Sequence, residues 1–320
     1  MIKKGFEIVK GNNISDELIN YRDKYNEKGK YVGFSRFEGI YRMALGTCTD
    51  WTGIPRSGKT QVLMELLLNT SKFYGWRHLL YFPDVGNKWE VLSDLIHKYT
   101  GKSFNPMHKN AISDKEIYDS IEWITHHFLI LTKKDVKANL TPFEFWDMAV
   151  EMKKNDPNGL HTACIDSWKD MHHDYNKYGG YAMYLEKVLP YRNQLAEDNN
   201  LHFHTVIHPK ATDKVDGKRQ MPTPYDLKGG SEWFNSGKCM VTVHRESVEQ
   251  NFVDINFTKI KPRSNGTPGH ISLNFDLDKF VYYEQKENGS RTYAQPEQGK
   301  PSINQIVDFG TIQTDFPFDQ

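Results

Sequence analysis

The sequence predicts an α/β protein with a mostly parallel central sheet flanked by helices, and with antiparallel strands near the C-terminus. Three observations predict this fold class. The 320 residues are enough for one large α/β domain with appendages, or for two modest domains. Short β-forming runs alternate with segments of helical periodicity as far as about residue 200. After residue 240, strand-like runs follow one another directly, which favours antiparallel pairing at the end of an otherwise parallel sheet.

The N-terminal part contains one expected helix and one expected strand. Residues 15–28 predict a helix, since Ser15 or Asp16 can cap it, acidic residues fill its first turn and Gly29 ends it. A Gly-rich and aromatic segment, 31–46, then leads to a strand at 47–52. Asp50 makes this strand unusually polar.

The remaining elements follow from periodicity and turn signals. A helix is expected after residue 60, where apolar residues recur at helical spacing until Gly75. Further helices are expected over 88–99, 114–126, 142–154 and 181–199. Further strands are expected over 78–82, 128–131, 162–165, 203–207, 240–243, 252–260 and 271–283.

The composition changes towards the C-terminus and divides the chain into three parts. From about residue 285 the sequence is polar and rich in Gly, Pro and Ser, which is typical of a flexible tail. We therefore assign 1–46 to an N-terminal leader with its helix, 47–284 to the main domain, and 285–320 to the tail.

Charge and cysteine content exclude several classes of protein. Lys plus Arg and Asp plus Glu each number 41, so binding to a polyanion must depend on local patches. Cys48, Cys164 and Cys239 are far apart and lie in expected strands, which indicates buried thiols in a reducing cytosol. No apolar run is long enough to span a membrane, and no signal segment is present. We expect a cytoplasmic protein without a membrane partner.

Residues 53–60, GIPRSGKT, fit the phosphate-binding pattern G-x-x-x-x-G-K-[ST] at every fixed position. Glycines allow such a loop to turn tightly, so that backbone N–H groups and a helix N-terminus face the phosphates. Lys59 is expected to reach the β- and γ-phosphates of ATP, and the Thr60 hydroxyl to bind Mg²⁺. The expected ATP-binding residues are Gly53, Ser57, Gly58, Lys59, Thr60 and Gln61.

Two further strands end in a carboxylate. Asp166 ends the strand at 162–165, and Asp84 follows the strand at 78–82. Because ligands bind at the carboxyl ends of strands in an open α/β sheet, Asp166 is expected to hold Mg²⁺ opposite Thr60. Asp84 is expected to position or activate water, with Glu90 as a second candidate. The alternative in each case is a carboxylate that only caps a turn.

His208 ends another strand and is a candidate sensor of the γ-phosphate. Cations are concentrated in the segment that follows, which suits a contact to a nucleic-acid backbone. These cations are Lys210, Lys214, Lys218 and Arg219. The same segment contains Asp213 and Asp216, so a solvated charge run is the alternative.

Lys261 and Arg263 follow the strand at 252–260 and are two residues apart. Cations in such a place can neutralise charge on a transferring phosphoryl group, either within the chain or from a neighbouring chain. A sheet edge protected by charge is the alternative.

Together, and in order, these segments resemble the ATPase domain of DnaB/Twinkle-type hexameric replicative helicases, a branch of the RecA-like P-loop ATPases. The resemblance covers residues 14–284, and its specificity lies in the order and spacing of the motifs. Besides the phosphate loop and Asp84, the segments are Gly33-Phe34-Ser35, Ile165-Asp166-Ser167-Trp168-Lys169-Asp170, His208-Pro209-Lys210, Asp226-Leu227-Lys228-Gly229-Gly230-Ser231 with Trp233, Val243-His244-Arg245, and Lys261-Pro262-Arg263 before Asn265-Gly266.

The resemblance implies a RecA-like core that forms a ring, hexameric in the manner of the family, with ATP between subunits. Lys59, Thr60 and Asp166 would act from one chain, while Lys261 and Arg263 would reach the γ-phosphate held by the next. Asp84 would take the place of the family's catalytic glutamate, which is one methylene longer. The basic segment after His208 would hold single-stranded DNA, and the helix at 15–28 would be a linker helix docked on a neighbour.

The expected function is therefore an ATP- and Mg²⁺-dependent DNA helicase. Two alternatives remain: a RecA-like recombinase or DNA-organising ATPase, and a P-loop small-molecule kinase. The aromatic and acidic residues 315–319 resemble docking tails, which predicts contact with a primase, polymerase or single-strand-binding protein; a disordered end is the alternative. Only a short leader precedes the linker helix, so the primase or loader domain common in the family is not expected within this chain, which is either a stand-alone helicase or a fragment of a longer product.

Overall fold

A ten-stranded sheet runs through the computed structural model, which describes residues 8–9, 11, 14–23, 29–135, 137–210, 214–215, 218–247 and 249–298. The helices are α1 (Ser15–Asp23), α2 (Lys59–Tyr74), α3 (Lys88–Thr100), α4 (Asp114–His127), α5 (Pro142–Asn155), α6 (Tyr181–Asn199) and α7 (Gly230–Ser236). The strands are β1 (Gly29–Lys30), β2 (Met43–Ala44), β3 (Thr47–Thr52), β4 (His78–Tyr81), β5 (Phe128–Ile130), β6 (Thr162–Asp166), β7 (His202–Ile207), β8 (Lys214–Val215), β9 (Lys218–Arg219), β10 (Cys239–His244), β11 (Phe252–Ile260), β12 (Gly269–Asp276), β13 (Val281–Gln285) and β14 (Arg291–Tyr293).

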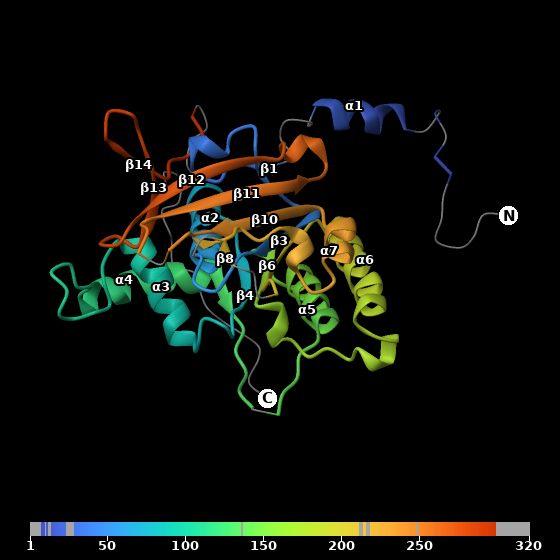
Figure 1. Cartoon of the computed structure of the whole chain (residues 1–320), viewed down its shortest axis with the longest axis horizontal. Helices are drawn as coiled ribbons and strands as arrows, with labels where there is room; N and C mark the ends of the chain where they lie inside the picture. The colour runs from blue at the N-terminus through green and yellow to red at the C-terminus, as the bar shows by residue number, and fades with distance from the viewer. Residues whose placement is uncertain are drawn as a thin grey trace.

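The strand order in the large sheet is β14-β13-β12-β11-β10-β3-β7-β6-β4-β5. The six strands from β10 to β5 pair in parallel, and β11 to β14 continue the sheet with antiparallel pairing. Helices flank the parallel half (Figure 1), and the antiparallel strands continue the sheet beyond β10, at the end of the strand order opposite to β5. This arrangement confirms the predicted fold class.

Capping side chains fix where several helices begin. A capping box opens each of α3, α4 and α5, in which a polar side chain and a glutamate three residues later each accept a backbone N–H. The pairs are Asn87 with Glu90, Ser113 with Glu116, and Thr141 with Glu144. These local signals explain why the predicted helices and the observed helices begin at the same residues.

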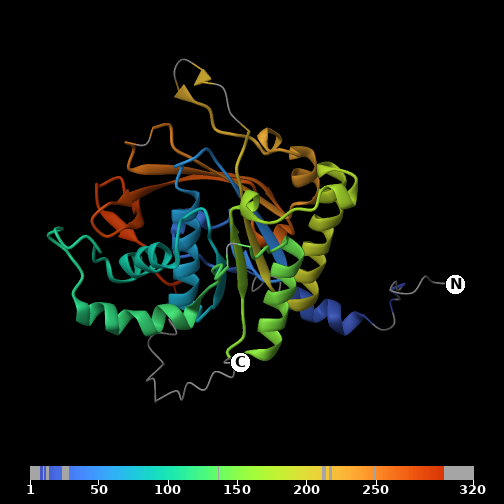
Figure 2. The same ribbon diagram turned by 90° about the horizontal axis from the view of Figure 1, so that it is seen from below.

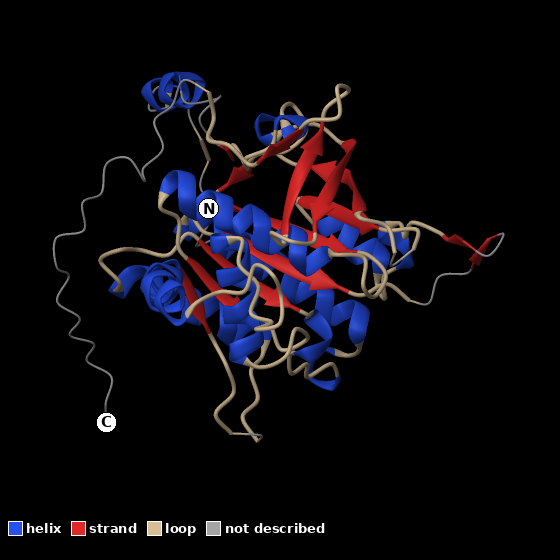
Figure 3. Ribbon diagram, turned by 90° about the vertical axis from the view of Figure 1, so that its left-hand side faces the viewer, coloured by secondary structure: helices blue, strands red, loops and turns tan. Residues whose placement is uncertain are grey.

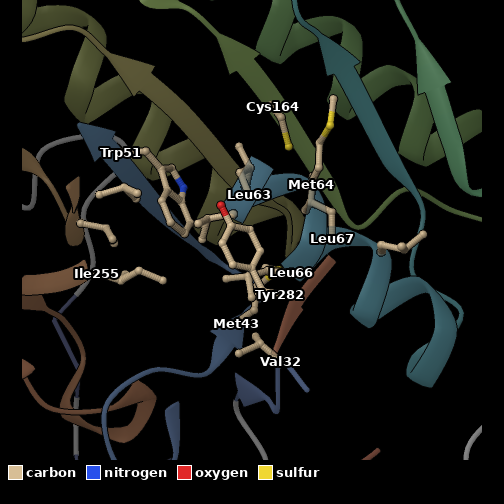
Figure 4. Packing of buried hydrophobic residues seen from close by; sticks show 14 of the residues in the cluster. Val32, Met43, Trp51, Leu63, Met64, Leu66, Leu67, Cys164, Ile255 and Tyr282 are labelled. Atoms are coloured by element: carbon tan, nitrogen blue, oxygen red, sulfur yellow. The ribbon is translucent and has the colours of Figure 1, made fainter. Parts of the chain in front are cut away.

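Two apolar cores lie on opposite faces of the sheet. One packs α2, α3 and α4 against the sheet, and includes Trp51, Leu63, Leu66 and Tyr282 (Figure 4). The other packs α5, α6 and α7 against the opposite face. The segment between β1 and β2 contributes to the first core, through the buried side chains of Val32, Phe34, Phe37 and Tyr41. Residues 29–46 are therefore packed on the main domain.

The structure differs from the sequence-based expectation in two strand regions. The single strand predicted over 271–283 is wrong, because β12 and β13 form a hairpin around residues 277–280. The turn is closed by the Asp276 carboxylate, which accepts the backbone N–H groups of Asp278 and Lys279, both at 3.1 Å. In the range predicted as a tail, β14 pairs with β13, so the sheet continues beyond residue 284. Residues 299–320 lie outside the described part.

The three cysteines are buried and form no disulfide, as predicted, in β3, β6 and β10. At the N-terminus, α1 ends at Asp23, and the rest of the predicted helix, 24–28, lies outside the described residues. Within the described ranges, no helix combines the length and apolar character needed to cross a bilayer.

A buried ion pair explains the acidic residue in the central strand β3. Both Asp50 and Arg192 are fully buried, and two guanidinium nitrogens donate to the two carboxylate oxygens at 2.5 and 3.0 Å. The guanidinium also donates to Thr205 Oγ1 at 3.0 Å. A bidentate pair of this kind compensates the cost of burying both charges, which is why a polar strand can occupy the middle of the sheet.

Breaking this pair is expected to destabilise the fold strongly. Asp50→Ala leaves the Arg192 charge buried without a partner, so we expect a loss of about 3–5 kcal/mol in the free energy of unfolding. The free energy of unfolding is measured by urea denaturation, with circular dichroism as the signal. The apolar double variant Asp50→Leu/Arg192→Met should recover most of the loss. Asp119→Ala, which removes an exposed i,i+4 partner of Lys115, is the control and should leave stability nearly unchanged. Equal effects from Asp50→Ala and Asp119→Ala would contradict this account.

Candidate nucleotide-binding site

The phosphate loop connects the end of β3 to the start of α2, at the carboxyl edge of the parallel strands. Its backbone requires glycine at two positions. Gly53 has φ 153°, and a Cβ there would lie 2.2 Å from the carbonyl oxygen of Val243. Gly58 has φ 94° and caps the N-terminus of α2. The strand, loop and helix expected around the motif are therefore all present.

Lys59 and Ser57 carry the buried polar groups of the loop. Lys59 is 5% exposed, and its Nζ donates to the carbonyl oxygens of Gly53 and Ile54, both at 3.0 Å. Burial lowers the pKa of Lys59, because it disfavours the charged amine. The Ser57 hydroxyl is buried, and its oxygen has no hydrogen-bond partner in the described structure. A buried ammonium and an unpaired hydroxyl at one loop fit a phosphate group.

Thr60 and Asp166 bring two oxygen ligands together at this loop. The Thr60 hydroxyl donates to Asp166 Oδ2, which connects the start of α2 to the end of β6. Asp166 is 1% exposed, and burial raises its pKa to about 6, against the opposing effect of the Thr60 hydrogen bond. A hydroxyl and a carboxylate are the hard oxygen donors that Mg²⁺ prefers, so these residues fit the predicted metal.

Asp84 lies in the segment that follows β4, next to Asp166, and both of its carboxylate oxygens are engaged. Lys169 Nζ is 2.7 Å from Oδ1, and His208 Nε2 is 3.2 Å from Oδ2. The Asp84 backbone N–H donates to the Asp166 carbonyl at 3.2 Å. Burial alone would raise the pKa of Asp84, but the Lys169 hydrogen bond and the charges of Lys169 and His208 outweigh it, so the pKa is lowered. Asp84 is thus an oriented carboxylate.

Lys169 is the residue of this cluster to which sequence reasoning assigned no role. It lies in a short 3₁₀ helix, Trp168–Asp170, directly after β6. Its hydrogen bond to Asp84 raises its pKa, and more than half of its side chain is exposed. A sequence signal existed, because Lys169 follows the strand-terminal Asp166 by three residues, but its partner is on another strand.

The structure places two other candidates away from this cluster. The Gln61 side chain turns to α3, where Nε2 donates to Asp94 Oδ2 at 2.8 Å. Glu90 accepts the Asn87 backbone N–H at 2.7 Å in the capping box of α3. Asp84, rather than Glu90, is therefore the carboxylate beside Asp166.

The segment after His208 forms a β-ribbon. Pro209 bridges to Leu227, and the Lys210 backbone N–H donates to the Asp226 carbonyl at 2.8 Å, which closes the base of the ribbon. Beyond this base, β8 pairs with β9 in antiparallel register. The two short strands project from the body (Figures 2 and 3). Lys214, Lys218 and Arg219 occupy this ribbon, and Lys210 lies exposed at its base.

Lys261 and Arg263 lie at the opposite edge of the sheet from the phosphate loop. In the register, Ile260 pairs with Cys239 at the start of β10, whereas Thr242 pairs with Thr52, the last residue before the loop. Both cations are exposed, and they line a cavity of about 1230 Å³ together with residues of α1. They are therefore not part of the cluster around Lys59 within one chain.

Comparisons with known proteins show what the chain as a whole is similar to. No protein-family model matches the chain. It is 23% identical over 301 residues to the Twinkle homolog protein, chloroplastic/mitochondrial, of Arabidopsis thaliana, a match that covers 89% of this chain and 40% of that protein. The chain thus spans less than half the length of this relative.

Solved structures show the same fold. One of them, the structure of a separate ATPase domain, superposes with a TM-score of 0.68 at 15% identity, over 85% of this chain and 99% of that one. A structure of a DnaB-like replicative helicase and its interactions with primase gives a TM-score of 0.63 at 15% identity, over 87% of this chain and 68% of that one. The chain has the RecA-like ATPase fold and resembles the DnaB/Twinkle-type replicative helicases.

Proposed function

We propose that this protein is an ATP- and Mg²⁺-dependent DNA helicase that acts as a ring on single-stranded DNA. One observation supports the proposal most strongly: the expected catalytic groups lie at opposite ends of the strands of one sheet. Lys59, Thr60, Asp84, Asp166 and His208 surround the phosphate loop, whereas the two cations after β11 lie at the far edge. A second subunit would be needed to complete the site.

The residues at the loop account for binding and for water activation. Lys59 would exchange its two carbonyl partners for the β- and γ-phosphates of ATP. Thr60 and Asp166 would hold Mg²⁺, which when bound neutralises phosphate charge. Asp84 would accept a hydrogen bond from the attacking water and orient it towards the γ-phosphate. His208, in contact with Asp84, lies directly before the base of the β8–β9 ribbon, so a change at the phosphate could reach the ribbon through it.

DNA binding is proposed for the β8–β9 ribbon. The chain has no net charge, so a local concentration of cations is the feature that suits a phosphate backbone. Lys210, Lys214, Lys218 and Arg219 belong to the ribbon or its base. In a ring, ribbons from successive subunits would follow a single strand through the centre.

The test combines assembly with activity. Mass measured in solution with and without ATP and single-stranded DNA should change from a single chain to a hexameric ring, and a forked duplex should be unwound only with ATP. Filament formation without unwinding would instead indicate a RecA-like recombinase or DNA-organising ATPase. If the rate of ATP turnover is the same with and without DNA, and the protein shows no salt-sensitive DNA binding, a P-loop small-molecule kinase would be indicated.

Partner and compartment remain sequence-based proposals. The similarity to a helicase structure determined with its primase interactions supports a primase as one partner of this chain. The predicted docking residues 315–319, for a primase, polymerase or single-strand-binding protein, lie outside the described residues. The proposed site of action is the cytoplasm of a bacterium or of a phage-infected cell.

We also propose that Lys169 positions Asp84 for hydrolysis, since Asp84 is shorter than the glutamate of the resembled family. Lys169→Gln should lower kcat about 10–100-fold and leave KM for ATP nearly unchanged, because a misplaced carboxylate affects the reacting geometry rather than ground-state binding. Steady-state phosphate release measures both constants, and Lys169→Arg should restore part of kcat.

A double-mutant cycle separates this role from a structural one. In an Asp84→Asn background, Lys169→Gln should have little further effect on kcat, because Lys169 acts through Asp84. Lys187→Gln, an exposed lysine on α6, is the matched control. Additive losses in the cycle, or an unchanged kcat for Lys169→Gln, would contradict the positioning role.

A further inference from the structure

A second basic feature lies beside Asp84, in a groove separate from the phosphate loop and from the β8–β9 ribbon. Its cavity volume is about 440 Å³. The end of β4 forms one wall, the start of α3 a second, and the segment after β5 a third. The lining residues are Tyr81, Phe82, Pro83, Gly86, Asn87, Lys88, Trp89, Val91, Ile130, Leu131, Thr132, Lys133 and Lys134. The groove thus opens at the same carboxyl edge of the sheet as the phosphate loop.

All charged residues that line the described groove are lysines. Lys88, Lys133 and Lys134 face it, and no carboxylate is among its described lining residues. Lys133 and Lys134 are exposed and form no ion pair with another residue in the described part of the chain. Because the whole chain carries equal numbers of acids and bases, this one-sided lining is a local feature.

The groove also carries an exposed indole. Trp89 is 65% exposed, whereas the chain's other tryptophans are buried or partly buried. Lys88 Nζ lies 4.6 Å from the centre of the Trp89 ring, so a cation and a flat aromatic face are presented together. Tyr81 and Phe82 also line the groove, and both are buried.

The segment that carries Lys133 and Lys134 is fixed at both ends. The Leu131 backbone N–H donates to the Leu80 carbonyl at 2.8 Å, and the His172 backbone N–H donates to the Leu140 carbonyl at 2.9 Å. Between these points the segment projects from the lower edge of the molecule (Figure 1). The second of these bonds joins it to the chain that follows Asp166, so the groove is structurally connected to the nucleotide site.

We propose that this groove is a second contact site for single-stranded nucleic acid, separate from the β8–β9 ribbon. Phosphates would pair with Lys133 and Lys134, and an unpaired base would stack on Trp89. A duplex would not suit the site, since its base faces are covered by stacking. This inference rests on the proposed DNA-dependent function and adds a second binding point to it.

Binding of a fluorescein-labelled oligothymidylate to the full chain, followed by anisotropy, tests the groove. Trp89→Ala should weaken binding at least about five-fold, which corresponds to the loss of about 1 kcal/mol of stacking, while Trp89→Phe should keep most of the affinity. Lys133→Gln/Lys134→Gln should lower the slope of log affinity against log salt by about 1.4. Lys187→Gln is the matched control, and ATP turnover without DNA should be unchanged in the groove variants.

The outcomes separate this inference from the proposed function. If wild-type protein fails to bind the oligonucleotide, the proposed function is wrong. If substitutions of Lys214 and Lys218 weaken binding but the groove variants retain full affinity and salt slope, only the groove inference is overturned. It is also overturned if a peptide of residues 308–320, which is acidic and aromatic, quenches Trp89 fluorescence while the oligonucleotide does not.

Discussion

Lys59→Ala is expected to abolish ATP turnover. The Nζ of Lys59 is the buried cation of the phosphate loop, held at 3.0 Å by two loop carbonyl oxygens. Its removal takes away the charge that would stabilise the transferring phosphoryl group. A single preorganised donor of this kind contributes about 10²–10³ in kcat, so phosphate release should fall by at least that factor.

The same substitution is not expected to unfold the protein. Lys59 is buried without an ion-pair partner among the described residues, and its ammonium donates to two backbone oxygens. Burial lowers its pKa and outweighs the charges of Asp166 and Asp84, which favour the ammonium, so loss of Lys59 removes a desolvated charge. Lys59→Met, which keeps the apolar stem, should be equally inactive and have an unfolding midpoint close to that of the wild type. Lys187→Ala is the control for loss of an exposed lysine. Turnover by Lys59→Met within a few-fold of wild type would refute the assignment.

Local sequence signals predicted most of the helices and the parallel half of the sheet because these signals act over short distances. Capping boxes and helical periodicity involve neighbours within four residues, so they can be recognised in the sequence alone. The predicted start of α6 at Tyr181 and its end at Asn199 agree with the structure. The hairpin between β12 and β13 was not predicted. The β-forming residues of β12 continue almost to the turn that Asp276 closes, so the two strands look like one in the sequence.

Long-range pairing explains the other differences. The sequence alone does not explain why an aspartate occupies β3. The partner of Asp50, Arg192, is 142 residues away, and no local pattern connects the two residues. In the same way, β14 was assigned to a tail on composition, although its polar residues pair with β13. The composition of a segment indicates how polar its side chains are, but it does not indicate which distant strand the segment can pair with.

The candidate site was predictable where residues follow strand ends. Asp84, Asp166 and His208 each follow or end a parallel strand, and such strand ends meet at one edge of a sheet. Lys169 was missed because its importance arises only from its distance to Asp84. The roles of all these residues remain predictions, which the substitutions above are designed to test.

Arg263→Ala is expected to leave nucleotide binding by the isolated chain intact and to lower ATP hydrolysis in the assembly by about 10³-fold or more, as expected for an arginine that neutralises the transferring group. The side chain is exposed at the sheet edge opposite the phosphate loop and makes no ion pair within the described residues, so the fold should be unaffected. ATP affinity of the monomer and phosphate release with DNA measure the two halves of this prediction. Lys238→Ala, which removes another cation lining the same cavity, is the matched control.

Mixing two inactive variants determines whether Arg263 acts on a neighbouring subunit. In an Arg263→Ala ring every nucleotide site lacks the arginine, and in a Lys59→Ala ring every site lacks the loop lysine. Random equimolar mixing would pair an intact loop with an intact arginine at about one quarter of the interfaces, and hydrolysis should reappear to that extent. If Arg263 acted within its own chain, no subunit would hold both groups and the mixture would stay inactive. Because the sheet register separates the two residues across one molecule, recovered activity is the expected result.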